Sequence, residues 1–214
     1  MKRWIIGAAT AVLVSCGSSS SGTTYNGGIN GTPPGGNSGF VFTPVDGGAL
    51  IVGQTSCTIS STSAKVTGLL LGFSSYSGMC GFVRSHGVGC LDTGKASATF
   101  VGIAVFDADL LAASPIGPGT YTMNTQVPAG ATGFIVTEGT VTVTDAGCVD
   151  SGPDPLSLGG TITITSASAA QVTGSVNLTW TGGGFSGPFD VVGCTASVDV
   201  CGLANATATC SACF

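Results

Sequence analysis

The residues that could perform hydrolytic chemistry centre on His86, the only histidine of the chain. Ser85 precedes it directly and Asp92 follows within a few residues. A serine, a histidine and an aspartate can supply a nucleophile, a general base and the carboxylate that orients the base. The sequence lacks the Gly-x-Ser-x-Gly turn that presents a serine nucleophile. We therefore interpret His86 as a solvated turn residue, and a hydrolase site around it is the alternative hypothesis.

The acidic residues offer little for paired-carboxylate chemistry. Glu138 is the only glutamate, so a glycosidase would depend mainly on aspartates. Asp107 and Asp109 are two residues apart and would share a face if a strand continued past Phe106. We interpret them instead as marking the solvated end of that strand, and we predict no catalytic residues and no cofactor.

A second acidic group could bind a metal ion. Asp145, Asp150 and Asp154 surround Cys148 in a stretch rich in turn residues, and their carboxylate oxygens are ligands that Ca²⁺ accepts. Their spacing is not that of an EF-hand loop. Solvated loop charges are the simpler interpretation, and a calcium site is the alternative.

Nine cysteines are present, and Cys16 stands apart from the others near the N-terminus. The remaining eight form an even set, which in an exported chain indicates disulfide bonds. These eight are Cys57, Cys80, Cys90, Cys148, Cys194, Cys201, Cys210 and Cys213. The sequence cannot select the pairing, but we expect Cys80–Cys90 to close a local loop and Cys148–Cys194 to tie two strand ends.

Cys210 and Cys213 form a Cys-x-x-Cys pair near the end of the sequence. A zinc site needs a second closely spaced pair of ligands, and Cys194 and Cys201 are too far apart in sequence to match that pattern. A thioredoxin-like pair opens a helix beside a parallel sheet, which this position does not suggest. Disulfide bonding is therefore favoured over zinc binding and over redox chemistry.

The N-terminus has the pattern of an export signal. Lys2 and Arg3 precede an apolar stretch over residues 4–14, which is too short to span a bilayer. The stretch ends in Leu13-Val14-Ser15-Cys16, which resembles the lipobox of bacterial lipoproteins. The resemblance implies cleavage before Cys16 and lipid attachment, including palmitate-type acyl chains, on that residue. Two or three acyl chains suffice for stable anchoring.

Residues 17–39 are rich in Gly, Ser, Thr, Asn and Pro, which predicts a flexible tether with a root-mean-square span of roughly 25–30 Å. The resulting organisation is a signal peptide over residues 1–15, a lipidated cysteine and tether over 16–39, and one folded head over 40–214. Gly17 after Cys16 resembles the sorting pattern for the outer membrane. The predicted localisation is therefore the cell envelope, lipid-anchored at the outer membrane.

Composition excludes several classes of function. Of 214 residues 36 are glycine, only 7% are charged, and the formal net charge is −5. An acidic chain with five basic residues has no basic surface for phosphates, so nucleic acid is not a predicted partner. Mean hydropathy is +0.52, yet after residue 15 no apolar run is long enough to span a bilayer.

Period-two alternation of apolar and polar residues predicts strands in the head. Residues 140–144 and 161–165 alternate strictly between threonine and a β-branched apolar residue, and residues 172–180 alternate with Trp180 on the apolar face. Residues 100–106 are apolar on both faces and predict a central strand. Residues 185–192 predict another strand, which Pro188 would place at an edge or a bulge. The pattern predicts an all-β antiparallel sandwich, or a barrel-like alternative.

Two segments of the head have similar sequences. Residues 58–68 resemble residues 163–174, and both predict a strand, a polar turn and a second strand. We favour convergence of two hairpins over duplication of a half-domain. Gly119-Thr120-Tyr121-Thr122, followed by the strands at 160–166 and 174–178, resembles uncharacterised bacterial envelope lipoproteins with an all-β head. That resemblance implies no activity.

The functional expectation is a lipid-anchored protein of the cell envelope with a structural or binding role. Its contacts would be the membrane, through the anchor, and an envelope protein or a carbohydrate, through exposed aromatics such as Tyr76 or Trp180. Trp180 is assigned more readily to the core. An envelope hydrolase around His86 is the alternative.

Overall fold

Strands dominate the computed structural model, which describes residues 27–28, 30–32, 42–59, 62–86, 95–123, 133–150, 158–181, 183–196, 198 and 201. This part of the chain contains one helix, α1 (Met79–His86), and a set of strands in one sheet. The strands are β1 (Asn30–Thr32), β2 (Asp46–Ile59), β3 (Thr62–Ser74), β4 (Thr99–Asp109), β5 (Gly119–Thr122), β6 (Gly133–Val143), β7 (Gly159–Ala167), β8 (Gln171–Trp180) and β9 (Gly183–Gly193).

The sheet runs in the order β5-β7-β8-β9-β2-β3-β4-β6, with β1 paired to the start of β9. All pairs are antiparallel except β2 and β9, which pair in parallel over a short stretch that includes Gly48 and Val192. The prediction of an all-β fold is confirmed, although the sheet is mixed. No pairing joins β5 to β6 among the described residues, so the sheet is open there.

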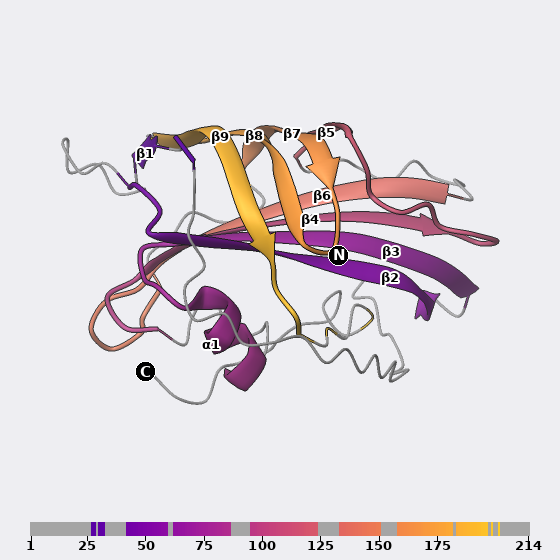
Figure 1. The fold of residues 1–214 in the computed structure, drawn as a ribbon, viewed down its shortest axis with the longest axis horizontal. Coiled ribbons are helices and arrows are strands. Elements are labelled where there is room, and N and C mark those ends of the chain that lie inside the picture. Colours follow the sequence, from indigo (N-terminus) through magenta and orange to yellow (C-terminus); the bar gives the residue numbers. More distant parts are fainter. Residues whose placement is uncertain are drawn as a thin grey trace.

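The sheet folds over itself into two layers whose strands cross (Figure 1). We call β5, β7, β8 and β9 the upper layer, and β2, β3, β4 and β6 the lower layer. Their facing side chains form one buried cluster, in which Phe73 of β3 contacts two rings of β9. The ring centroids lie 5.4 Å from Phe185 and 5.6 Å from Phe189. The fold is thus sandwich-like, with aromatic packing between the layers.

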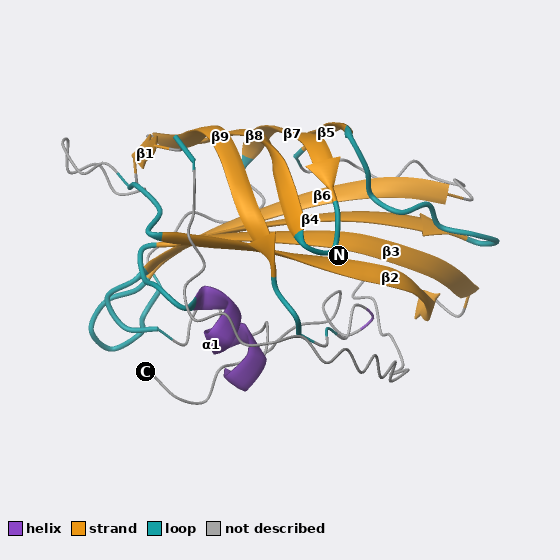
Figure 2. Cartoon of the chain, in the orientation of Figure 1, coloured by secondary structure: helices purple, strands orange, loops and turns teal. Residues whose placement is uncertain are grey.

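The far side of the lower layer is covered by α1, while β5, β7, β8 and β9 lie on the opposite side of the molecule (Figure 2). Met79 and Val83 of the helix pack with Leu50 of β2 and Phe100 of β4. A Cβ atom on Gly48 would lie 2.5 Å from the Cys194 sulfur and 2.8 Å from the Cys80 sulfur. Glycine at this position of β2 therefore allows the helix to lie close to the sheet.

Several strand predictions are confirmed. The described residues of 58–68 lie in β2 and β3, and residues 163–174 include the end of β7 and the start of β8; both strand pairs are antiparallel, so both similar segments contribute to hairpins. Residues 100–106 lie in β4, which has a strand on each side. Trp180 is 8% exposed and belongs to the core.

Three expectations need correction. Asn30–Thr32, placed in the predicted tether, forms β1, because pairing with β9 through the main chain requires no apolar pattern. α1 was not predicted. The strand with Pro188 lies inside the sheet and has no register shift. The Pro188 carbonyl accepts the Gly28 N–H, so the proline nitrogen also faces away from β8, and the ladder between β8 and β9 loses no bond.

Candidate functional site

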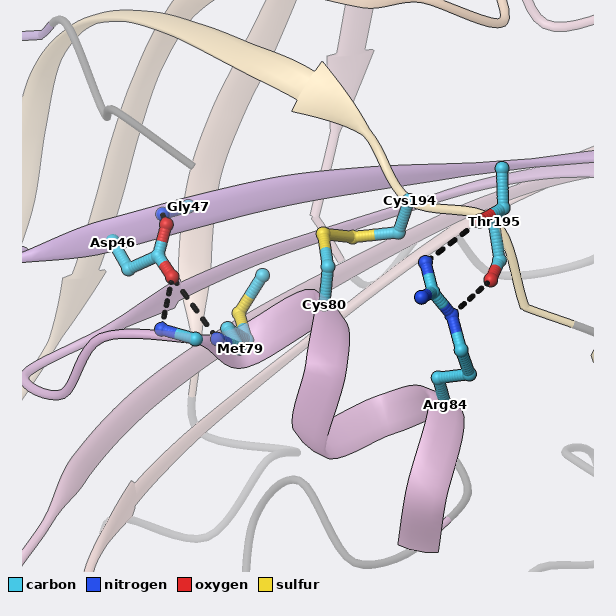
Figure 3. The surroundings of a disulfide bond; sticks show 8 residues. Asp46, Gly47, Met79, Cys80, Arg84, Cys194 and Thr195 are labelled. Atoms are coloured by element: carbon cyan, nitrogen blue, oxygen red, sulfur yellow. Dashed lines mark hydrogen bonds between the residues drawn. A yellow bond between two sulfur atoms is a disulfide. The ribbon is translucent and has the colours of Figure 1, made fainter. Parts of the chain in front are cut away.

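A disulfide bond and side-chain hydrogen bonds join α1 to the segment after β9 (Figure 3). Cys80 of α1 forms a disulfide with Cys194, with a Cα–Cα distance of 5.3 Å. We call this bond the helix disulfide. One helical turn further on, the Arg84 guanidinium donates from Nη2 to the Thr195 hydroxyl at 2.8 Å and from Nε to the Thr195 carbonyl at 3.3 Å. The helix and the segment are thus joined covalently and by hydrogen bonds.

Asp46 fixes the start of the helix from a distant point in the sequence. Its side chain is 1% exposed, and its Oδ2 accepts the N–H groups of Gly78 at 2.8 Å and Met79 at 3.0 Å. Its Oδ1 accepts the Gly47 N–H at 2.8 Å. The carboxylate thereby satisfies donors that a helix leaves free at its N-terminus, and its negative charge suits the positive end of the helix dipole. This role is structural.

A second disulfide joins Cys57 of β2 to Cys201, with a Cα–Cα distance of 5.5 Å. The expected pairs Cys80–Cys90 and Cys148–Cys194 are both wrong, because Cys80 and Cys194 bond to each other. The error arose from favouring short loops, whereas the fold brings the segment after β9 back beneath the lower layer. Cys148 is disulfide-bonded to a partner outside the described residues.

Four predicted site cysteines lie outside the described residues: Cys16, Cys90, Cys210 and Cys213. Lipid attachment at Cys16 and the role of the Cys-x-x-Cys pair stay predictions. Among the residues that the structure does describe, no group of three or more His, Cys, Asp or Glu side chains could hold a metal ion.

Of the residues considered for a hydrolase site, Ser85 and His86 belong to α1, and Asp92 lies outside the described residues. His86 is the last residue of α1, and its side chain is outside the described part, as is Asp92. The Ser85 hydroxyl donates to the carbonyls of Gly81 at 3.0 Å and Phe82 at 3.2 Å, within its own helix. His86 therefore lies at a helix end, and its interpretation as a turn residue is wrong.

β4 continues past Phe106 and includes both Asp107 and Asp109, so the interpretation that the strand ends before them is wrong. The two residues share a face of the strand, and their carboxylates bind the loop that follows it. Asp107 Oδ2 accepts the Ser114 N–H at 2.8 Å. Asp109 Oδ1 accepts the Leu111 N–H at 2.7 Å and the Ala112 N–H at 3.1 Å. These two bonds, the one from Leu111 first, lower the pKa of the Asp109 carboxyl below its ordinary value. Both carboxylates thus hold backbone at the strand end.

The described acidic residues considered for a calcium site also accept hydrogen bonds from backbone N–H groups. Asp145 Oδ1 accepts the N–H groups of Gly147 at 2.7 Å and Val149 at 2.9 Å, which closes a turn that contains Cys148. Asp150 Oδ1 accepts the Val143 N–H at 3.0 Å. Asp154 lies outside the described residues, so the three-carboxylate site stays a prediction.

Both aromatic side chains considered for ligand contact pack against other residues of the fold. Tyr76 is half-buried, packs edge-on against Phe82 with ring centroids 6.0 Å apart, and has the Lys95 ammonium 5.8 Å from its ring centre. Trp180 is buried in the core. Of the two, only Tyr76 could contribute to a surface contact.

The outer face of the upper layer is a polar surface that the search for catalytic motifs did not identify. Most of its outward side chains are hydroxyls and amides from alternate positions of β5, β7, β8 and β9, and Pro188, Asp190 and Val192 of β9 share that face. The hydroxyls and amides are Thr120, Thr122, Thr161, Thr163, Thr173, Ser175, Asn177, Thr179 and Ser186. We call this set the hydroxyl face. The alternating threonines of residues 161–165 were the available signal, but only the strand register shows which residues are neighbours.

Two pairs of hydroxyls bond across strands at this face. The Thr120 and Thr163 hydroxyl oxygens are 3.0 Å apart, and the Thr173 hydroxyl oxygen is 2.7 Å from that of Ser166, which lies outside the defined set. Such cross-strand pairs stabilise a sheet and restrict the rotamers of their members. Thr120, Thr163 and Thr173 of the hydroxyl face are therefore held in place by these bonds.

Comparison with known proteins adds no assignment, since no protein-family model, curated protein or solved structure matches the chain. In the part of the chain that the structure describes, no helix is long and apolar enough to cross a membrane.

Proposed function

We propose that this chain is an exported lipoprotein of the cell envelope, held by lipid on Cys16 at the outer membrane, whose all-β head has a structural or binding role. The observation that carries the proposal is the disulfide bonding of the head. Cys57–Cys201 and the helix disulfide both join elements far apart in sequence. Bonds of this kind persist in oxidising compartments and are rare in the cytosol, which agrees with the export signal.

The position of β1 supports an anchor close to the head. β1 begins at Asn30, so the chain from Cys16 to this strand can extend at most about 50 Å, at roughly 3.6 Å per residue. The upper layer, to which β1 is paired, would therefore stay within that distance of the lipid surface. A role in contact at the envelope is consistent with such a short connection.

The test is the intact mass of protein extracted from membranes, alkylated with and without prior reduction. We expect a chain that begins at Cys16 with a lipid-sized mass increment, and we expect the eight other thiols to react only after reduction. A Cys16→Ser variant should appear without the increment and be lost from the membrane fraction. An unlipidated native chain would contradict the anchor, and thiols that react before reduction would contradict the fully bonded head.

A further inference from the structure

The hydroxyl face differs from an ordinary solvent-facing sheet in its lack of charge. Strands usually carry lysine, glutamate or other charged residues on the solvent side, which keeps the surface from associating. β5, β7, β8 and β9 contain no lysine or arginine, and Asp190 is their single acidic residue. The Gln171 side-chain amide donates to Asp190 at 2.6 Å, at one end of the face. The rest of the face is neutral.

The register places polar residues of four strands in one continuous row. Each of them pairs directly with the next, in the order Thr122, Thr161, Asn177 and Ser186. Since neighbouring strands lie about 4.8 Å apart, the row extends for roughly 14 Å across the upper layer. Thr122, Asn177 and Ser186 are exposed, and Thr161 is half-buried. The row ends at Ser186, where β1 pairs with β9 through the main chain.

The chemistry of the row limits what can bind along it. A polyanion needs basic side chains, which these strands lack. A protein partner is held mainly by aromatic or arginine side chains in desolvated pockets, and the row offers neither. Hydroxyl and amide groups both donate and accept hydrogen bonds, so they complement a partner that is itself neutral and rich in hydroxyls. A neutral polysaccharide has this chemistry.

The twist of the sheet further defines the ligand. Adjacent strands rotate by about 20–25°, so the three steps of the row accumulate roughly 60–75°. A flat crystalline surface could contact only part of such a row, whereas a single polymer chain can follow it. We propose that the hydroxyl face binds a single chain of a neutral polysaccharide along the row from Thr122 to Ser186. This inference rests on the proposed binding role and names its ligand class.

The lower layer provides the contrast that supports this assignment. Its outer side is covered by α1 and by the disulfide-bonded segment, through apolar clusters that include Met79 and Cys201. The hydroxyl face has no described element packed over it, and Thr120, Ser175 and Thr179 are exposed in addition to the row. The fold thus directs one broad polar face outward.

The experiment is native affinity electrophoresis of the full lipidated chain in a polyoxyethylene detergent. The gels would contain dextran, galactomannan, xyloglucan or mixed-linkage β-glucan, with alginate as a polyanionic comparison. We expect retardation by at least one neutral polymer and none by alginate. Thr161→Val/Asn177→Val removes one hydroxyl and one amide from the centre of the row and should weaken binding about tenfold, as expected for two lost hydrogen bonds.

The matched control is Gln54→Val/Thr58→Val, which removes one amide and one hydroxyl from exposed positions of β2 in the lower layer. It should bind as the native chain does, and melting curves establish that both variants are folded. The proposal is overturned by no retardation in any neutral polymer, by retardation in alginate alone, or by equal weakening in the two variants. None of these results alters the intact-mass test, so failure of the ligand assignment is separable from failure of the anchored-head proposal.

Discussion

Replacement of Asp46 by alanine tests the role of this carboxylate in holding α1 against the sheet. In the native protein the carboxylate accepts three backbone N–H groups, from Gly47, Gly78 and Met79. In the variant the Gly78 N–H can reach water because that residue is exposed, whereas Gly47 and Met79 are buried. Two buried donors therefore lose their acceptor.

The expected cost follows from those two donors. A buried donor left without a partner costs about 1–3 kcal/mol, and loss of a helix N-cap about 0.5–2 kcal/mol. Relief from burying a carboxylate offsets part of this, so we expect Asp46→Ala to lower the free energy of unfolding by about 3 kcal/mol. For a chain of this size that corresponds to a melting temperature lower by roughly 6–12 °C.

Calorimetry of the disulfide-bonded protein measures the global effect, and hydrogen exchange of the Phe82 and Val83 amides measures the local one. Asp107→Ala is the control, because it removes a single bond, to the Ser114 N–H at an exposed loop, and should cost below about 1 kcal/mol. The reasoning is refuted if Asp46→Ala melts within about 2 °C of the native protein with unchanged exchange in α1.

Three further substitutions test other parts of the fold. Gly48→Ala places a methyl group against both sulfur atoms of the helix disulfide. It should lower the free energy of unfolding by about 1–3 kcal/mol, and alkylation assays should find more of that disulfide unformed. Gly53→Ala, whose methyl group would have no atom within 4 Å, should show neither effect. Phe73→Ala removes the ring that packs between two rings of β9, and chemical denaturation should show a loss of about 3–5 kcal/mol; a loss near that of an exposed residue would contradict its place in the core. Asp109 has a lowered pKa in the folded state, so its charge stabilises the fold above the ordinary aspartate pKa, and this contribution disappears as the pH falls through the lowered value. The stability difference between the native chain and Asp109→Asn should therefore be present at neutral pH and vanish in strong acid, and a difference independent of pH would contradict this account.

Local patterns predicted the strands whose two faces have different chemistry. Alternation of threonine with isoleucine identified β7, and alternation over residues 172–180 identified β8 with Trp180 inward. These predictions succeed because one face is buried and the other is solvated, which imposes period two on the residues themselves. The hairpin turns were predicted for the same reason.

Other features depend on contacts between distant segments and left no local signal. α1 spans only two turns and takes its N-terminal acceptor from Asp46, more than 30 residues earlier, so no capping pattern precedes it. β1 is held by main-chain pairing in a low-complexity stretch. The disulfide partners and the row of the hydroxyl face follow from strand order and register, which the alternation of side chains does not determine.

The connectivity of the two disulfides has a consequence for how the protein matures. Cys57 and Cys80 are separated from their partners by 144 and 114 residues, and each partner lies near the end of the chain. A chain that crosses a membrane from its N-terminus presents Cys57 and Cys80 to the oxidising side long before Cys194 or Cys201. The first two can meet each other first, and a bond between them would have to be exchanged, because thiol–disulfide exchange is how wrong pairs are corrected. Under the proposed export, maturation would therefore require an isomerising catalyst, or oxidation slow enough for Cys194 and Cys201 to arrive.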